Sequence, residues 1–192
     1  TQHPQTRALA ARLQQAHPTD TAKIGAVLHL FRTQPFRYTL EPPLLTGDTV
    51  DGFLFTTRAG FCEHYASAFV VLMRAMGVPA RIVTGYQGGQ WNPVDGFMTV
   101  RQSDAHAWAE VWLSGRGWTR VDPTAAVAPE RIERADASTA GAQDVFGSFM
   151  RTDGGLYTLW RNARFQWEAL NNSWNQWILG YTPERQKSLL GT

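Results

Sequence analysis

Residues 60–86, with the sequence GFCEHYASAFVVLMRAMGVPARIVTGY, decide the fold that we predict for this chain. After Cys62, apolar residues recur every three or four positions, which is typical of a buried amphipathic helix; they are Tyr65, Ala66, Phe69, Val70, Leu72, Met73 and Met76. Gly77 and Pro79 are expected to end this helix. The composition of 80–86 then predicts a strand.

The sequence after this stretch predicts an antiparallel sheet. Three segments are rich in Trp, Val and Thr, as strands are; they are 97–101, 105–113 and 117–121. Ser114-Gly115-Arg116-Gly117 is a hairpin turn signal between the last two. We therefore expect an α+β fold in which the helix of 62–76 packs on an antiparallel meander of these strands and 80–86.

The two ends of the chain are predicted to be helical. Helices are expected at 5–16 and from about 20 to 33, followed by a short strand at 36–40, so that residues 1–123 form one core. Residues 124–155 lack periodicity and are predicted to be a surface loop region. In 156–192, Trp160, Trp167 and Trp174 recur every seven residues, which indicates a long helix with an aromatic face. We expect this face to pack on the core; the alternative is a connector near a bilayer surface, where Trp concentrates.

Composition excludes several functions. The 192 residues carry 18 basic and 16 acidic side chains without a dense Lys/Arg run, so no nucleic acid partner is expected. Cys62 is the single cysteine, which excludes an intrachain disulfide and a multi-cysteine zinc site. Acidic residues are scattered, so we expect no metal, including calcium, and no cofactor. No apolar run is long enough to span a membrane and no signal peptide is expected, while the oligomeric state stays open.

Cys62 is the candidate nucleophile. In the first turn of a helix, free backbone N–H groups and the positive end of the helix dipole favour a thiolate. The same N–H groups are suited to hold an oxyanion. A lone cysteine is also often a small buried hydrophobic residue, and Cys62 by itself does not separate these interpretations.

His106 and Asp122 are the candidate base and its partner. Strand alternation places His106, Trp108, Glu110 and Trp112 on one face. If Leu113 faces Gly117, Trp108 faces Asp122, and His106 lies diagonal to Asp122 at roughly 7–8 Å between Cα atoms.

A register shifted by one residue would put Asp122 on the opposite face. We therefore predict the first register, with a loop of about three residues and a glycine in the left-handed region. Viewed singly, His106 suits a half-buried strand and Asp122 a turn. Together with Cys62 they suit nucleophilic catalysis, with His106 as base and then acid and Asp122 orienting its ring.

The strings GFCEHYASAFVVLMRAMGVPARIVTGY, SDAHAWAEVW and GWTRVDPT resemble the cysteine, histidine and aspartate motifs of the transglutaminase-like superfamily. That family shares its catalytic core with papain-like proteases. The lead-in 50–55 and the tail 170–186 are most similar to the periplasmic part of bacterial inner-membrane proteins of the transglutaminase protein A type. The resemblance implies an excised periplasmic domain whose membrane segments lie outside this chain.

The resemblance also implies a reaction and partners. The expected activity is that of a protein-glutamine gamma-glutamyltransferase, which passes an acyl group from a carboxamide through a Cys62 thioester to an amine or water. The expected partners are a protein or peptide carboxamide donor and an amine acceptor of the cell envelope. The family uses an aromatic residue upstream of the cysteine as a second oxyanion donor, for which Tyr38 is the candidate.

Further residues are expected to shape the cleft, namely His64, Asp104 and Trp108. Glu63 and His64 do not suggest a metal site, because consecutive helix residues point apart. Two alternatives remain open: a papain-like cysteine peptidase or amidase, which the same residues would serve, and a non-catalytic envelope-binding module.

Overall fold

The structure is a computed structural model that describes residues 2–128 and 154–179. The chain divides into two compact units, Thr1–Gly88 with Arg101–Ala137, and Gly89–Val100 with Ser138–Thr192. The first unit contains most of the regular elements; they are α1 (Pro4–Ala16), α2 (Asp20–Thr33), β1 (Arg37–Tyr38), α3 (Thr49–Asp51), the π-helix η1 (Gly52–Thr57), β2 (Ala59–Gly60), α4 (Cys62–Ala75), β3 (Ala80–Tyr86), the 3-10 turn η2 (Gln102–Asp104), β6 (Ala105–Leu113), β7 (Gly117–Val121) and the 3-10 turn η3 (Pro123–Ala126). The second contains β4 (Gln90–Trp91), β5 (Met98–Thr99) and α6 (Gly154–Leu179).

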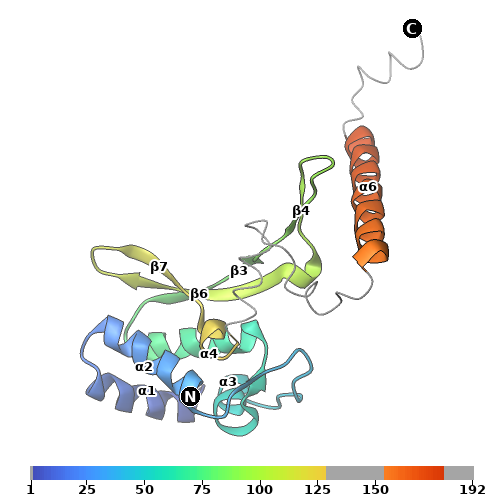
Figure 1. Cartoon of the computed structure of the whole chain (residues 1–192). Helices are drawn as coiled ribbons and strands as arrows, with labels where there is room; N and C mark the ends of the chain where they lie inside the picture. Colours follow the sequence, from blue (N-terminus) through green and yellow to red (C-terminus); the bar gives the residue numbers. More distant parts are fainter. Residues whose placement is uncertain (1, 129–153, 180–192) are drawn as a thin grey trace. The chain divides into compact units, whose positions relative to one another are not determined.

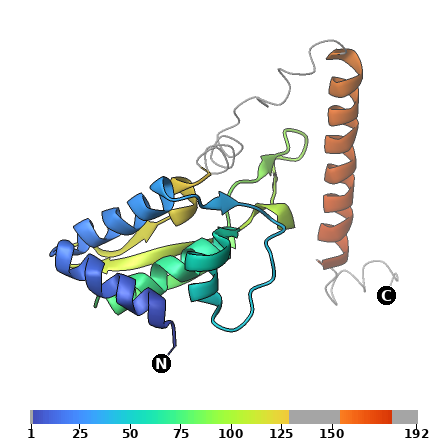
Figure 2. The ribbon, with the colours of Figure 1, turned by 90° about the horizontal axis from the view of Figure 1, so that it is seen from below.

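Helix α4 is the centre of the first unit. It lies between the sheet of β3, β6 and β7 and the N-terminal helices, so the unit has three layers (Figure 1). Seen from below, α1 and α2 lie side by side (Figure 2). Apolar side chains of α4 that the sequence places at helical spacing are buried in this layer, including Tyr65, Phe69, Leu72 and Met73. The predicted amphipathic helix and the α+β class are therefore confirmed.

The β6–β7 hairpin has the register that the sequence predicts. Leu113 pairs with Gly117 and Ala109 with Val121. The loop of residues 114–116 needs a left-handed backbone, and Gly115 has φ 78° and Gly117 φ 75°. Along β6 one face is buried against α4, through Ala107, Ala109, Val111 and Leu113. Since side chains alternate along a strand, His106 and Trp108 lie on the other face.

The predicted meander is wrong in one strand. Segment 97–101 does not join the sheet, because β5 pairs only with β4, and β3 pairs directly with β6. Gly88 and Gly89, with φ of 94° and 154°, follow the end of β3 with backbone angles that favour glycine. The small hairpin then closes on itself through a bond from Asn92 N–H to the Phe97 carbonyl.

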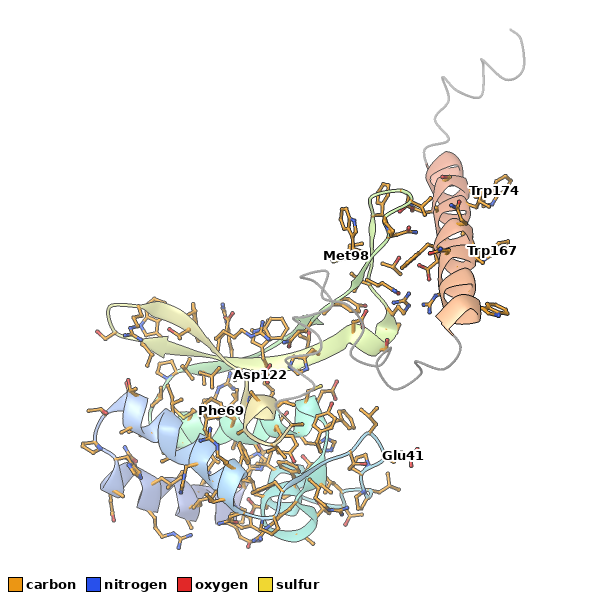
Figure 3. The ribbon with its side chains drawn as sticks, viewed as in Figure 1. Glu41, Phe69, Met98, Asp122, Trp167 and Trp174 are labelled. Atoms are coloured by element: carbon orange, nitrogen blue, oxygen red, sulfur yellow. The ribbon has the colours of Figure 1, made fainter. Side chains whose placement is uncertain are left out.

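In the second unit, α6 packs on the β4–β5 hairpin. Among the α6 residues whose side chains the structure describes, Phe165 and Ala169 are buried and apolar. The Asn92 side chain donates to the Phe165 carbonyl at 3.0 Å. Trp160, Trp167 and Trp174 are 75%, 70% and 59% exposed. Figure 3 shows Trp167 and Trp174 pointing away from the hairpin. Within this unit the three tryptophans are exposed, whereas Phe165 and Ala169 are buried. That the tryptophan face packs on the core stays a prediction.

The first residues of the segment 124–155, which the sequence predicts to be a surface loop, belong to the folded first unit. Thr124 and Ala128 are buried, and Thr124 lies in η3, which contacts α4 and α2. Residues 129–153 of that prediction lie outside the described residues, as do 180–192 of the predicted C-terminal segment. None of the helices within 2–128 and 154–179 combines the length and hydrophobicity that a bilayer crossing requires.

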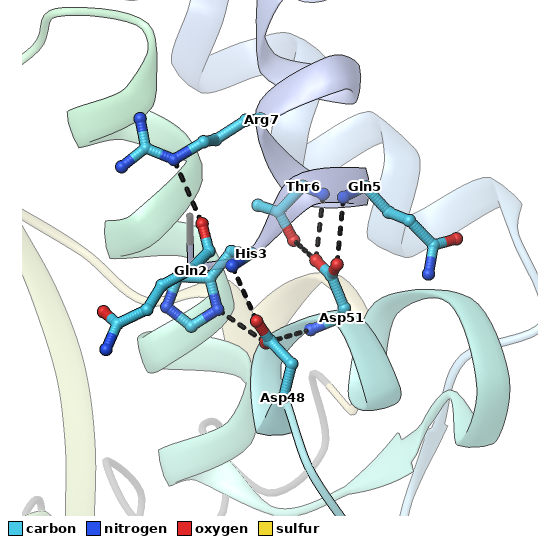
Figure 4. Close-up of polar contacts among 7 residues, drawn as sticks. All are labelled: Gln2, His3, Gln5, Thr6, Arg7, Asp48 and Asp51. Carbon is cyan, nitrogen blue, oxygen red and sulfur yellow. Dashed lines mark hydrogen bonds and ion pairs between the residues drawn. The ribbon is translucent and has the colours of Figure 1, made fainter.

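Asp48 and Asp51 connect α1 and α3 through hydrogen bonds (Figure 4). Asp51 accepts hydrogen bonds from the backbone N–H groups of Gln5 and Thr6, both at 2.9 Å, and so caps α1. Asp48 caps α3 through Asp51 N–H and also accepts from His3. These hydrogen bonds lower the pKa of Asp48 to about 2, and the bond from Asp51 N–H contributes most. The pairing holds the N-terminal layer against the segment that leads into α4.

Candidate active site

Cys62 is the first residue of α4, as the sequence predicts, and is 8% exposed. Its sulfur lies among small residues, because Ala66 of α4 and Ala107 of β6 pack around it. Hydrogen bonding from the backbone N–H groups of Ala107 and Glu63 contributes to lowering the pKa of the Cys62 thiol. The nucleophile candidate is therefore held by its own helix and by the strand that carries His106.

The turn before Cys62 requires a glycine. A Cβ at Gly60 would lie 2.7 Å from Cβ and Cγ of His64, closer than real side chains approach. The His64 ring occupies this space because its Nδ1 accepts a hydrogen bond from Phe61 N–H at 3.3 Å. This local bond stands in for a helix cap and fixes where α4 begins.

His106 and Asp122 meet across the β6–β7 hairpin. His106 Nε2 lies 2.6 Å from Asp122 Oδ2, and both side chains are 10% exposed. Figure 3 shows Asp122 at the end of β7, where the chain turns into η3. Interaction with His106 lowers the pKa of the Cys62 thiol, and interaction with Cys62 raises the pKa of His106, so the two groups are electrostatically coupled. Since Nε2 faces Asp122, Nδ1 is the ring nitrogen that remains for the sulfur.

The carboxylate of Asp122 is held at both oxygens. Oδ1 accepts from the backbone N–H of Thr124 at 3.1 Å, which makes Asp122 the cap of η3. Oδ2 accepts from Arg120 Nη2 at 3.3 Å in addition to its contact with His106. The proline that follows Asp122 starts η3 and so sets this turn.

The pKa directions favour a thiolate paired with an imidazolium. Burial opposes ionisation of Cys62, but hydrogen bonds from His106 and from the two backbone N–H groups lower the pKa of the thiol. Burial likewise opposes the charged form of His106, but hydrogen bonds with Asp122 and Cys62 raise its pKa to about 9. Burial acts against the Asp122 carboxylate too, and the hydrogen bond with His106 still lowers the pKa of that group.

Trp108 lies beside the histidine. Its ring centroid is 6.2 Å from that of His106, with 22° between the planes, so it walls one side of the site. Gly85 of β3 leaves room for this ring, since a Cβ there would lie 3.1 Å from Trp108 Cη2. Asp104 lies in η2 and accepts from Arg101 N–H at 2.7 Å, so it shapes the turn that leads into β6.

Tyr38 and His64 lie near the start of α4. Tyr38 pairs with Gly60 through β1 and β2, and its ring stacks on Tyr65 at 6.3 Å. His64 lies against Phe61, at 4.5 Å between ring centroids, and burial lowers its pKa. His64 also lines, with Glu63 and Ser67, a pocket of about 400 Å³ whose other wall is the segment 42–53; the wall residues there are Pro42, Pro43, Leu44, Leu45, Thr49, Val50 and Phe53.

One group of side chains in the described residues has a metal-like composition. Ligand atoms of His3, Asp48 and Asp51 lie within 4.8 Å of one another. These oxygens already accept hydrogen bonds from backbone N–H groups of α1 and α3, so helix capping explains the group (Figure 4).

Sequence reasoning missed Arg120 and Gln87. Arg120 Nη2 bonds both Asp122 and, at 3.0 Å, Gln87 Oε1. A signal for Arg120 was available, because it lies two residues before Asp122 on a strand and so shares its face. Gln87 follows β3 outside any periodic pattern, and its approach to β7 depends on the sheet order.

Comparison with known proteins places these motifs in a family. A family model described as the transglutaminase-like superfamily matches residues 7–123. The protein-glutamine gamma-glutamyltransferase of Pseudomonas aeruginosa is 45% identical over 196 residues, which cover 98% of this chain and 29% of that protein. The uncharacterized protein YebA of Bacillus subtilis is 35% identical over 144 residues, which cover 71% of this chain and 20% of YebA.

Solved structures also match more than two thirds of the chain. The periplasmic domain of TgpA from P. aeruginosa matches with a TM-score of 0.68 and 52% identity, over 70% of this chain and 47% of that chain. The structure of the same domain bound to ethylmercury matches with a TM-score of 0.67 and 53% identity, over 69% of this chain and 48% of that chain. The chain thus spans less than a third of these two curated relatives and about half of the solved domain.

Proposed function

Because the chain belongs to the transglutaminase-like superfamily, we propose that it is a cysteine-dependent acyltransferase with Cys62, His106 and Asp122 as its catalytic residues. The observation that supports this most is the 2.6 Å contact between His106 Nε2 and Asp122 Oδ2, together with the electrostatic coupling between His106 and the Cys62 thiol. The family and the named relative support an enzyme. The match to the TgpA domain identifies this chain as the counterpart of a periplasmic domain, as the sequence predicts.

Acylation follows from the charge state of the site. The Cys62 thiolate attacks the carbon of a glutamine carboxamide and forms a C–S bond, and the oxygen becomes an oxyanion. His106, as imidazolium, gives its proton to the leaving nitrogen, so the C–N bond breaks and ammonia departs. Asp122 stabilises the imidazolium before this transfer and keeps Nε2 protonated afterwards.

Deacylation reverses the proton transfer. Neutral His106 takes a proton from an incoming primary amine, whose nitrogen attacks the thioester carbonyl and expels the Cys62 thiolate. The sum is a carboxamide and an amine converted to a substituted amide and ammonia. With water in place of the amine the product is a carboxylate, which is the amidase alternative.

Oxyanion stabilisation is assigned to the start of α4. The first backbone N–H groups of a helix lack the usual partners four residues back, so we propose that the start of α4 supplies the oxyanion donors. Tyr38 is proposed as a second donor, because β1 pairs with β2 two residues before Cys62. The assay below tests it, since a Tyr38→Phe variant with the wild-type kcat would remove Tyr38 from the mechanism.

We place the substrates in the cell envelope: a glutamine-bearing protein or peptide as donor and a primary amine as acceptor. The named relative and the periplasmic TgpA domain support this class. The chain covers only part of both, so the substrates of the whole protein belong to the proposal.

The test is a product assay on the full chain. A glutamine peptide blocked at both ends is incubated with and without a fluorescent primary amine, while released ammonia and incorporated amine are measured. We expect both products from the wild type, and neither from a Cys62→Ala variant that keeps its circular dichroism spectrum. Ammonia without amine incorporation would instead identify an amidase. No product from the wild type would contradict the acyltransferase and leave the envelope-binding module. Retained product in Cys62→Ala would remove Cys62 as the nucleophile.

A further inference from the structure

Two arginine–tryptophan stacks lie on the same sheet. Arg120 Cζ of β7 is 4.4 Å from the centroid of Trp108, and Arg81 Cζ of β3 is 4.1 Å from that of Trp118. Each arginine also pairs with a carboxylate. Arg81 pairs with Glu110 at 2.7 Å, whereas Arg120 pairs with Asp122, the partner of His106. The two stacks therefore share chemistry and differ in the carboxylate that they hold.

The guanidinium of Arg120 is held from three sides. Trp108 supports its plane, Gln87 Oε1 accepts from Nη2 at 3.0 Å, and Asp122 Oδ2 accepts from Nη2 at 3.3 Å. Gln87 is itself fixed, because its backbone N–H donates to the Asp104 carbonyl at 2.8 Å. Arg120 thus connects the end of β3, the β6 tryptophan and the start of η3.

The contact with Asp122 involves the oxygen that matters for catalysis. Oδ2 faces both Arg120 Nη2 and His106 Nε2, while Oδ1 is occupied by Thr124 N–H. Because the Arg120 guanidinium is fixed, its hydrogen bond to Oδ2 limits rotation of the Asp122 carboxylate. The positive charge of Arg120 also favours the ionised form of Asp122. Trp108 adds a second link, since the ring under Arg120 also lies beside His106.

We propose that Arg120 is a positioning residue, which keeps the Asp122 carboxylate ionised and aimed at His106. This role rests on the proposed acyltransferase function. Within the described residues, the charged and titratable groups facing Asp122 are His106 from β6 and Arg120 from β7, and Cys62 of α4 lies beyond His106. The direction of the Asp122 pKa agrees, since the Arg120 bond is among the causes that lower it, after those from His106 and Thr124.

The test compares Arg120→Met with the matched variant Arg81→Met. Methionine keeps an apolar stem over the tryptophan in both variants and removes the charge. The titration midpoint of the Asp122 carboxyl is measured by ¹³C NMR, with Asp122→Asn assigning the signal. We expect Arg120→Met to raise the midpoint by about one pH unit, because a positive neighbour is lost. Arg81→Met is expected to leave the Asp122 midpoint unchanged. Arg120→Lys keeps the positive charge, so its Asp122 midpoint is expected to lie close to that of the wild type.

Turnover gives the second readout. Arg120→Met is expected to lower kcat about tenfold, which is the loss typical when a residue that orients a functional group is removed. KM is expected to stay within about twofold of the wild-type value. Equal midpoints and equal kcat values in Arg120→Met and Arg81→Met would overturn the assignment. The NMR titration requires no substrate. An inactive wild type would therefore contradict the proposed function, and the midpoint would still decide whether Arg120 acts on Asp122.

Discussion

The β6–β7 and β4–β5 hairpins differ in what their side chains contact, although both are short, antiparallel and rich in aromatic residues. In β6–β7 one face is packed on α4, with Val111 0% exposed. In β4–β5 the aromatic residues stay outside, and Phe97 is 51% exposed. Burial of one face fixes the register of a hairpin, because a slip of one residue would expose every buried side chain. The hairpin with a buried apolar face is the one that places His106 and Asp122 at a defined distance.

The largest difference between variants of the two hairpins is expected in kcat, for Asp122→Asn at the end of β7. The amide keeps a hydrogen bond to His106 but favours the wrong tautomer of its ring. We expect kcat to fall by about 10³- to 10⁴-fold, as in triads of this kind. The measurement is steady-state turnover with the blocked glutamine peptide.

The control is Asp95→Asn in the β4–β5 hairpin, where Asp95 Oδ1 accepts from Phe97 N–H at 3.1 Å. That variant is expected to keep the wild-type kcat. A wild-type rate in Asp122→Asn would remove the carboxylate from the mechanism.

A smaller effect is expected on stability. Val111→Ala removes two buried methyl groups between β6 and α4 and should lower the free energy of unfolding by about 2 kcal/mol. Phe97→Ala removes a larger side chain from an exposed position of the other hairpin, and we expect a change of no more than about 0.5 kcal/mol. Urea denaturation followed by far-UV circular dichroism measures both. Equal losses would show that both hairpins depend on their apolar faces to the same extent.

The same difference explains what the sequence allows one to predict. The spacing of apolar residues after Cys62 predicts α4, and alternation in 105–113 predicts which face is buried. Turn glycines then fix the register that brings His106 to Asp122. Apolar spacing, strand alternation and turn glycines can each be read from a short stretch of sequence. The burial of the residues concerned depends on a single neighbouring element.

Features that depend on the choice of partner were not predictable in this way. Met98 and Thr99 have strand propensity, but propensity does not say which strand they join. The tryptophans at intervals of seven indicate an aromatic face of α6, whereas packing depends on Phe165 and Ala169. The bond between Arg120 and Gln87 follows from the order β3–β6–β7, which the sequence pattern alone does not reveal.

The pH dependence of Cys62 alkylation by iodoacetamide tests the central claim most directly, because the thiolate is the reacting form. Hydrogen bonds from His106 and the backbone lower the pKa of this thiol, so its thiolate persists as the pH falls below the range of an ordinary cysteine. We predict that the wild type keeps reacting at mildly acidic pH, and that His106→Ala moves the alkylation midpoint up to about 8.5, the value of a free thiol. A wild-type midpoint already at that value would contradict the account.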